Sequence, residues 1–186
     1  MTRGIISQTA DTELLRAHLA GDREAFRELY ERHRNHLWAI ALRTTGNPDD
    51  AADAIQDAWV SIHTSATSYR ADASVASWLH KIVVNSCLDR IRRCRSHDTV
   101  PLFEFATMIA DDHDYTEDID VSLSIGRALD VLTPDQRAAI ILVDLNGYSI
   151  SDAAAALQVP FGTVKSRCSR GREKLALVLN YLREEI

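Results

Sequence analysis

The chain has 186 residues, of which 46% are hydrophobic, and its formal net charge is −6. A length of this order suits one or two domains that each bury a core. The negative balance argues against a protein that coats nucleic acid or membrane surfaces through charge alone. The sequence contains neither a signal peptide nor an apolar run that approaches a membrane span, so we expect a cytoplasmic protein.

Cysteine and histidine usage gives no metal site. Cys87, Cys94 and Cys168 lack the paired spacing of zinc ligands, so we expect reduced thiols that are packed or incidental. His33 and His36 lack a third ligand, which favours a core-edge position for His33 over metal binding. We expect no metal or other cofactor.

The first helical patterns follow a short tail. Residues 1–10 show no periodicity and are expected to fray. A short helix is predicted next, capped by Asp11 or Thr12 and ended by Gly21. Asp22 then caps a second helix, and the inward face of this helix is formed by Phe26, Leu29, Tyr30, His33, Leu37, Ile40 and Ala41.

A third helix is predicted over about 51–66, after a break at Gly46-Asn47-Pro48, with Asp49 or Asp50 at its start. Ile55, Trp59 and Ile62 lie on its inner side, whereas another side carries Asp53, Gln56 and Asp57. Acids at this spacing usually serve solvation, and the residues alone favour that interpretation. The alternative is a docking surface for a basic partner.

A fourth helix is predicted over about 75–95, capped by Ser74. Its buried positions are Trp78, Leu79, Ile82, Val84, Leu88 and Ile91. Basic residues gather toward its end: Lys81, Arg90, Arg92, Arg93 and Arg95. Arginine is favoured at a helix C-terminus in any case. The alternative is a phosphate-contacting patch, which Tyr69 and Trp78 would complement by stacking on single-stranded bases.

The next stretch breaks the helical pattern. Residues 97–121 contain eight acids and no Lys or Arg, which leaves a net charge of +2 on the remainder. We expect an acidic linker with a short docking turn around Phe103, Phe105, Met108 and Ile109. Helices resume at Ser122, and Thr133-Pro134-Asp135-Gln136 forms a capping box for the next helix, which Gly147 ends.

The stretch from Tyr148 to Leu175 has the pattern of a helix-turn-helix. Ser149 is the expected cap of its first helix, and Pro160 lies in the first turn of its second. The second helix carries an apolar stripe: Val164, Cys168, Gly171, Leu175, Val178 and Leu182. Its opposite face is basic and suits a DNA major groove, although a solvated outer helix would show a similar pattern. The whole chain is therefore predicted to be all-α, with two small helical domains joined by an acidic linker.

Several stretches of these two helical patterns are distinctive together: Asp50–Trp59, Tyr69-Arg70 with Ser77-Trp78-Leu79, Val84-Asn85 with Leu88–Arg93, Leu132–Arg137, and Gly162–Arg167. In their order and spacing they resemble the extracytoplasmic-function (ECF, group four) sigma factors of bacterial RNA polymerase. The resemblance covers about 11–95 and 125–183. It implies a region 2 domain over 1–95, an acidic linker over 96–122, and a region 4 domain over 123–186.

The resemblance also implies roles for three groups of residues. The third helix would dock on a coiled coil of the largest polymerase subunit through Asp53, Gln56 and Asp57. The loop and fourth helix would read a single-stranded minus-ten element through Tyr69, Arg70, Trp78, Lys81 and Asn85, with Arg90, Arg92 and Arg93 on phosphates. The second helix of the helix-turn-helix would read the minus-thirty-five element through Lys165, Ser166, Arg167, Ser169, Arg170 and Arg172.

Four positions depart from the family pattern. Cys168 and Gly171 are smaller than the residues common there, so we expect a loosely packed recognition helix. Gln158 replaces a glycine that is common in the turn, and we expect backbone strain or an altered turn. Ser169 is often larger, so a promoter preference is not transferable from relatives.

The implied function is a non-catalytic factor that binds core RNA polymerase (the β′ and β subunits) and directs promoter-specific initiation. The resemblance further implies an anti-sigma factor that holds the protein inactive until a stress signal, and a linker that either enters the active-site channel or serves as a spacer. The main alternative is a helix-turn-helix regulator that binds duplex DNA without polymerase. An enzyme is disfavoured because the sequence has no Gly-rich phosphate loop or nucleophile elbow.

Overall fold

The computed structural model describes residues 10–71, 73–95, 125–126 and 128–184, with only the backbone described at 95 and 180–184. Every regular element within these ranges is helical, which confirms the predicted all-α class. The expected N-terminal tail, the acidic linker with its docking turn, and Ser122 lie outside the described residues. None of the described helices is long and apolar enough to cross a membrane.

Asp11 joins the first two helices and does not cap the first one. Helix α1 (Asp11–Leu19) has Ala10 at its N-cap position without a side-chain hydrogen bond, so the predicted caps Asp11 and Thr12 are wrong. The Asp11 carboxylate instead binds Arg32 at 2.6 Å and His33 Nε2 at 2.8 Å. The contact places the His33 side chain, which belongs to α2 (Arg23–Thr45), against α1, in agreement with the predicted core-edge position. It also joins α1 to α2.

The corner between α2 and α3 is set by three consecutive residues. Gly46 has a φ of 71°, a left-handed conformation that glycine adopts without strain and that ends α2. Asn47 then caps α3 (Pro48–Ser65) by accepting from Asp49 N at 2.8 Å and from Asp50 N at 3.1 Å. The prediction that Asp49 or Asp50 starts this helix is therefore wrong, because an earlier amide oxygen already satisfies their N–H groups.

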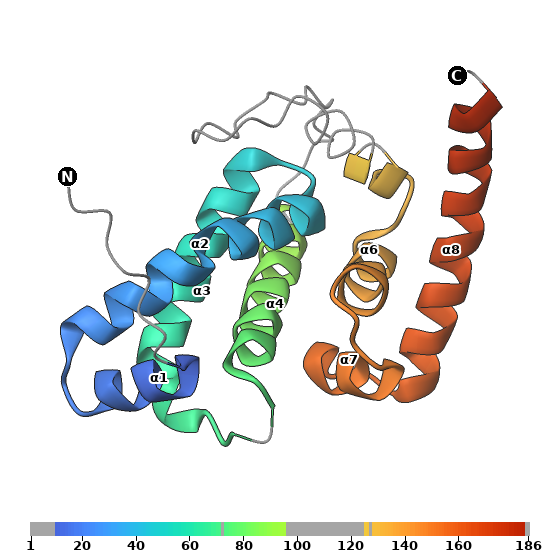
Figure 1. Ribbon diagram of the computed structural model, residues 1–186. Coiled ribbons are helices and arrows are strands. Elements are labelled where there is room, and N and C mark those ends of the chain that lie inside the picture. The colour runs from blue at the N-terminus through green and yellow to red at the C-terminus, as the bar shows by residue number, and fades with distance from the viewer. Residues whose placement is uncertain (1–9, 72, 96–124, 127, 185–186) are drawn as a thin grey trace.

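Helices α2, α3 and α4 (Val75–Arg95) form a bundle that α1 closes at one end (Figure 1). A short 3₁₀ turn, η1 (Ala66–Ser68), follows α3, and Ser74 caps α4 by accepting from Ser77 N at 3.1 Å. Ala51, Ala54 and Ala58 are fully buried on α3. Their small side chains let α3 lie close to its neighbours.

The second helical region, α6 to α8, begins with the predicted capping box. Thr133 Oγ1 accepts from Gln136 N at 3.3 Å, and Gln136 Oε1 accepts from Thr133 N at 3.2 Å. Helix α6 (Pro134–Ile140) continues into a π-helical turn, η2 (Ile141–Leu145). Ser149 caps α7 (Ile150–Leu157), as predicted, and α8 (Phe161–Glu184) follows.

The turn between α7 and α8 carries the strain expected from its sequence. Gln158 has a φ of 55° and a ψ of 41°, in the left-handed region that glycine occupies more easily. Pro160 directly precedes α8 rather than lying in its first turn, and its carbonyl accepts from Thr163 N at 2.9 Å. The local geometry is thus that of a helix-turn-helix, with the strain at Gln158.

Helix α8 packs closely on α6 at its smallest residue. A Cβ added at Gly171 would lie 3.0 Å from Ile140 Cγ1, so the hydrogen of glycine is what fits there. Val164 and Cys168 are also buried on this face, as predicted. The expectation of a loosely packed recognition helix is wrong, because the small residues are matched by a close approach of the two helices.

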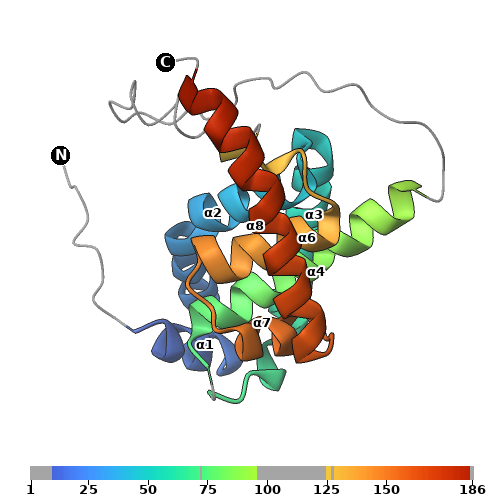
Figure 2. The same cartoon turned by 90° about the vertical axis from the view of Figure 1, so that its right-hand side faces the viewer.

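The two helical regions pack against each other in one hydrophobic core. Helix α6 contacts α2 and α4, and α7 contacts α4, while α8 lies on the outer side of α6 and α7 (Figures 1 and 2). Three hydrogen bonds between described residues cross this boundary. Tyr148 Oη donates to the Ser77 carbonyl at 3.0 Å and lies 3.3 Å from His80 Nδ1, and Asn85 Nδ2 donates to the Ala156 carbonyl at 3.0 Å.

Candidate docking and nucleic-acid interfaces

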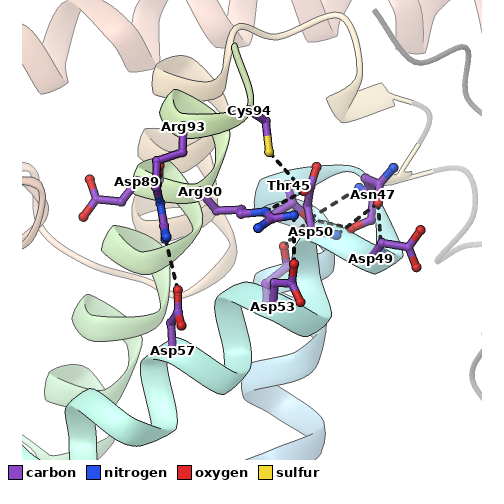
Figure 3. A network of polar contacts seen from close by, with 11 residues as sticks. Thr45, Asn47, Asp49, Asp50, Asp53, Asp57, Asp89, Arg90, Arg93 and Cys94 are labelled. Atoms are coloured by element: carbon purple, nitrogen blue, oxygen red, sulfur yellow. Dashed lines mark hydrogen bonds and ion pairs between the residues drawn. The ribbon is translucent and has the colours of Figure 1, made fainter. Parts of the chain in front are cut away.

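The residues predicted for docking lie on the exposed side of α3. Gln56 and Asp57 lie three and four residues after Asp53, so their side chains share a face of the helix with it. The two carboxylates are not isolated, because α4 runs alongside with its basic end. Arg90 reaches across with Nε at 2.9 Å from Asp50 Oδ1 and Nη2 at 2.8 Å from Asp53 Oδ2 (Figure 3).

A second bridge lies along the same pair of helices. Arg93 Nη2 is 3.0 Å from Asp57 Oδ2, and Arg93 Nε donates to the Asp89 carbonyl at 3.4 Å (Figure 3). The arginines are one helical turn apart on α4, as are Asp53 and Asp57 on α3. Two surfaces that the sequence presents as separate therefore form one ion-pair network, which we name the α3–α4 charge cluster: Asp50, Asp53, Asp57, Arg90 and Arg93.

Arg92 lies outside this cluster. Its Nη1 is 2.8 Å from Asp89 Oδ1, a partner on its own helix, and both side chains are more than 60% exposed. Such a pair is weak in water. The three arginines assigned together by the sequence thus divide into two that face α3 and one that faces solvent.

The thiols carry no reactive signature. Cys94 Sγ is 3.4 Å from Asp50 Oδ1, and burial together with this acid raises the pKa of the Cys94 thiol. Burial raises the pKa of Cys87 to about 12, and burial also raises the pKa of Cys168. Protonated thiols are poor nucleophiles and poor metal ligands. No group of three His, Cys, Asp or Glu in the described part of the chain is placed to bind a metal ion.

The loop before α4 holds two aromatic rings together. Tyr69 donates from Oη to the Ala73 carbonyl at 2.7 Å, and its ring centroid lies 5.7 Å from that of Trp78. Both side chains are half-buried, so Trp78 contributes to the core and to the surface. Arg70 is exposed beside them, and Ala71 has a φ of 58°. The structure therefore brings three of the predicted base-reading residues together, two in the loop and one in the first turn of α4.

The two remaining predicted base readers lie farther along α4 and are half-buried. Lys81 is one turn before Asn85, whose amide is bonded to the Ala156 carbonyl of α7. Asn85 is thus engaged by the second helical region in this conformation, and the sequence gives no sign of that contact. Reading a base with Asn85 requires this hydrogen bond to break.

Sequence reasoning missed a polar pair at the same boundary. His80 is 8% exposed, and its Nδ1 is 3.3 Å from Tyr148 Oη. Its Nε2 is buried without a hydrogen-bond partner among the described residues. Burial lowers the pKa of His80 to about 4, with a further contribution from His36 and His33. The residues are far apart in sequence, and no pattern joins them.

The exposed face of α8 carries the residues predicted for duplex DNA. Lys165 and Arg170 are exposed and form no ion pair within the described ranges. Ser169 Oγ donates to Glu173 Oε1 at 3.2 Å, and Ser166 Oγ donates to the Thr163 carbonyl at 2.9 Å. The two cations are therefore presented to solvent, while the serines are held by their own helix.

The other two arginines predicted to contact DNA, Arg167 and Arg172, are paired with acids on the helices behind α8. Arg167 Nη2 is 2.7 Å from Asp135 Oδ2 of α6. Arg172 makes a two-pronged contact with Asp144 of η2, at 2.8 Å from Nη2 and 3.2 Å from Nε to Oδ1. A fork of this kind fixes orientation as well as charge. These residues anchor α8, and as they stand they do not point freely toward a ligand.

Comparison with known proteins places this architecture. Residues 29–97 match the family described as Sigma-70 region 2, and residues 122–175 match Sigma-70, region 4. The ECF RNA polymerase sigma factor SigM of Mycobacterium tuberculosis is 49% identical over 94% of this chain and 87% of that protein. This chain belongs to the ECF sigma factors of RNA polymerase. The sigma factor is thus a transcription initiation factor and not an enzyme.

Solved structures of similar proteins agree with this assignment. The sigma factor RpoE of Bartonella quintana, solved in complex with the anti-sigma factor NepR, is 28% identical to this sigma factor with a TM-score of 0.66. The match covers 83% of this chain and 96% of that one. CnrH, solved in complex with the cytosolic domain of CnrY, has a TM-score of 0.63 at 24% identity over 93% and 99% of the chains, and it supports the fold alone.

Proposed function

We propose that this sigma factor docks on core RNA polymerase through the exposed carboxylates of α3 and reads two promoter elements with its two helical regions. The proposal assigns residues 1–95 to docking and to the minus-ten element, and 123–186 to the minus-thirty-five element. The intervening acidic stretch, 96–122, lies outside the described residues and is assigned as the linker. The observation that carries the proposal is the helix-turn-helix, whose α8 exposes Lys165 and Arg170 to solvent.

For the minus-thirty-five element, α8 enters the major groove. Lys165 and Arg170 are exposed donors, and a bidentate Arg contact to guanine is the commonest specific contact of this kind. Arg167 and Arg172 are paired with Asp135 and Asp144 on the supporting helices, so they present less of their charge to DNA than Lys165 and Arg170 do. Ser166 and Ser169 complete the surface.

For the minus-ten element, the proposed reader is the loop with Tyr69 and Trp78. Two half-buried rings 5.7 Å apart offer faces on which unpaired bases can stack, and stacking offsets part of the cost of unstacking the duplex. Arg70 and Arg92 lie exposed for phosphates. Lys81 and Asn85 join them once α7 moves away from α4.

We also propose that an anti-sigma protein sequesters this factor. Support comes from the relative RpoE, which was solved in complex with the anti-sigma factor NepR and matches over most of its length. A factor without such a partner would compete for polymerase continuously.

The test is reconstituted run-off transcription with purified core polymerase on a randomised promoter library. We expect enriched templates with two conserved blocks at a fixed spacing. Absence of start-site selectivity would refute the proposal. Gel shifts without polymerase separate the main alternative, because a stand-alone regulator would bind duplex operators tightly on its own.

A further inference from the structure

The α3–α4 charge cluster joins groups that the proposed function sends to different partners. Asp53 and Asp57 are the docking carboxylates, whereas Arg90 and Arg93 are the phosphate-binding cations. In the structure each carboxylate lies within 3.0 Å of one of these guanidinium groups. Neither the carboxylates nor the arginines therefore present their full charge to a partner.

The ion pairs are placed so that they can be exchanged. Their side chains keep between 24% and 60% of their surface exposed, with the Arg93–Asp57 pair the most accessible. Exposed ion pairs gain little over hydration of the separate charges, so a better-placed partner displaces them at small cost. Asp50 differs, because it also binds Cys94 and is only 24% exposed, which keeps one contact of Arg90 in place while the outer contacts change.

We propose that Arg90 and Arg93 shield the docking carboxylates in the free protein, and that a basic polymerase surface displaces them. Displacement frees the Arg93 guanidinium and the Nη2 edge of Arg90 for promoter phosphates, while Arg90 Nε stays on Asp50. The inference rests on the proposed function, which it deepens by linking the two partners at one surface. Because a coupling between two sites is reciprocal, phosphates that draw the arginines away also uncover Asp53 and Asp57 for the polymerase.

The shielding role predicts a different direction of change in polymerase affinity from the other possible roles of Arg90 and Arg93. If the arginines are a structural clamp, removing them destabilises the first helical region and weakens polymerase binding. If they contact only phosphates, removing them leaves polymerase binding in the absence of DNA unchanged. If they shield, removing them tightens that binding, because the carboxylates lose their internal partners and need not be freed.

The test measures the affinity of fluorescently labelled sigma factor for purified core polymerase, without DNA. The Arg90→Gln, Arg93→Gln double variant is expected to bind about three- to tenfold more tightly, given the small strength of exposed ion pairs. The matched control is Arg23→Gln with Arg27→Gln on α2, which also removes two positive charges but at a distance from both proposed surfaces. This variant is expected to bind core polymerase as tightly as the wild type does. A second measurement, binding of single-stranded minus-ten DNA to the holoenzyme, should weaken for the double variant.

Equal or weaker polymerase binding by the folded double variant would overturn the inference, as would an equal gain in the α2 control. If the double variant loses its circular dichroism melting transition, the Arg93→Gln single variant replaces it, since that pair is the more exposed, and the same criteria apply. Failure of the wild-type protein to bind polymerase would instead refute the proposed function, so the two failures are distinguishable.

Discussion

The two helical regions hold their cations in different ways. In the first, Arg90 and Arg93 point from α4 into the carboxylates of α3. In the second, the ion pairs lie behind α8, where they anchor Arg167 and Arg172, and Lys165 and Arg170 remain exposed. The basic residues of the first region are therefore neutralised by neighbouring acids, whereas two of those in the second region keep their charge exposed to solvent.

This difference shows that the position of an acid decides what a basic helix can do. An acid on a supporting helix, such as Asp135 or Asp144, orients its arginine and leaves the neighbouring cations available. An acid on an adjacent exposed helix, such as Asp53, neutralises its partner and must be displaced first. Under the proposed roles, the second region presents its cations to DNA directly, whereas the first needs another partner to release them.

The largest effect should come from reversing the docking charges. Asp53→Arg with Asp57→Arg places cations where the proposed docking carboxylates stand and adds repulsion with Arg90 and Arg93, so we expect loss of polymerase binding. Co-purification with core polymerase measures it. Glu24→Arg with Glu31→Arg on α2 is the control for charge, and thermal unfolding verifies the fold. Retained binding would show that α3 is not the docking surface. The ion pairs of the first region would then have no role in polymerase binding.

The second region is tested by one exposed cation. Arg170→Ala should weaken binding to a selected promoter by about 1–3 kcal/mol if the side chain reads a base. Titrations of holoenzyme with selected and with scrambled minus-thirty-five sequences measure the loss. A loss confined to the selected sequence supports base reading, whereas equal losses would reduce Arg170 to a phosphate contact.

The boundary between the regions should respond to pH through His80. Its folded pKa of about 4 lies below the ordinary value of 6.5, so the unfolded chain binds the proton first. Stability from this residue is therefore complete above pH 6.5 and is lost as pH falls from 6.5 toward 4, by about 2 kcal/mol at pH 5. Urea unfolding at pH 7 and pH 5 measures it, and the difference should shrink in His80→Gln. An equal difference in both proteins would assign the effect to other groups.

The smallest expected effect is at the hydroxyl of Tyr148. Tyr148→Phe removes the bond to the Ser77 carbonyl, which is worth about 0.5–1.5 kcal/mol. Amide hydrogen exchange in α7 should accelerate several-fold while exchange in α1 stays the same. Tyr69→Phe, which removes a hydroxyl bond within the first region, is the matched control. Unchanged exchange in α7 would mean that the Tyr148 hydroxyl adds nothing measurable to the apolar packing and the Asn85 hydrogen bond that hold the regions together.

Local chemistry made much of this fold predictable. The caps Asp22, Ser74, Thr133 and Ser149 were readable because each precedes an apolar-periodic stretch and binds an N–H group two or three residues on. The break at Gly46-Asn47-Pro48 was also predictable, because glycine, asparagine and proline in succession interrupt a helix. Where several candidate caps stood side by side, as at Asn47 to Asp50, the sequence did not say which oxygen is used first.

The contacts that matter most for function were not predictable, because they join residues far apart in the chain. The pairs of the α3–α4 charge cluster are separated by 36 to 40 positions where a hydrogen bond joins them, and the bonds of Asn85 and Tyr148 by 71. Gly171 was interpreted wrongly for the same reason, since only Ile140 on another helix explains its size. The roles assigned to the site residues stay predictions.

The bonds of Tyr148 and Asn85 to neighbouring helices limit how far this protein can reach. A compact chain of this length is roughly 40 Å across. Elements named for positions minus ten and minus thirty-five are centred about 25 base pairs apart, which is roughly 85 Å along B-form DNA at 3.4 Å per base pair. A single molecule cannot span that distance while α7 rests on α4, so simultaneous recognition of both elements requires the halves to separate, and the free energy that holds them together is subtracted from promoter affinity.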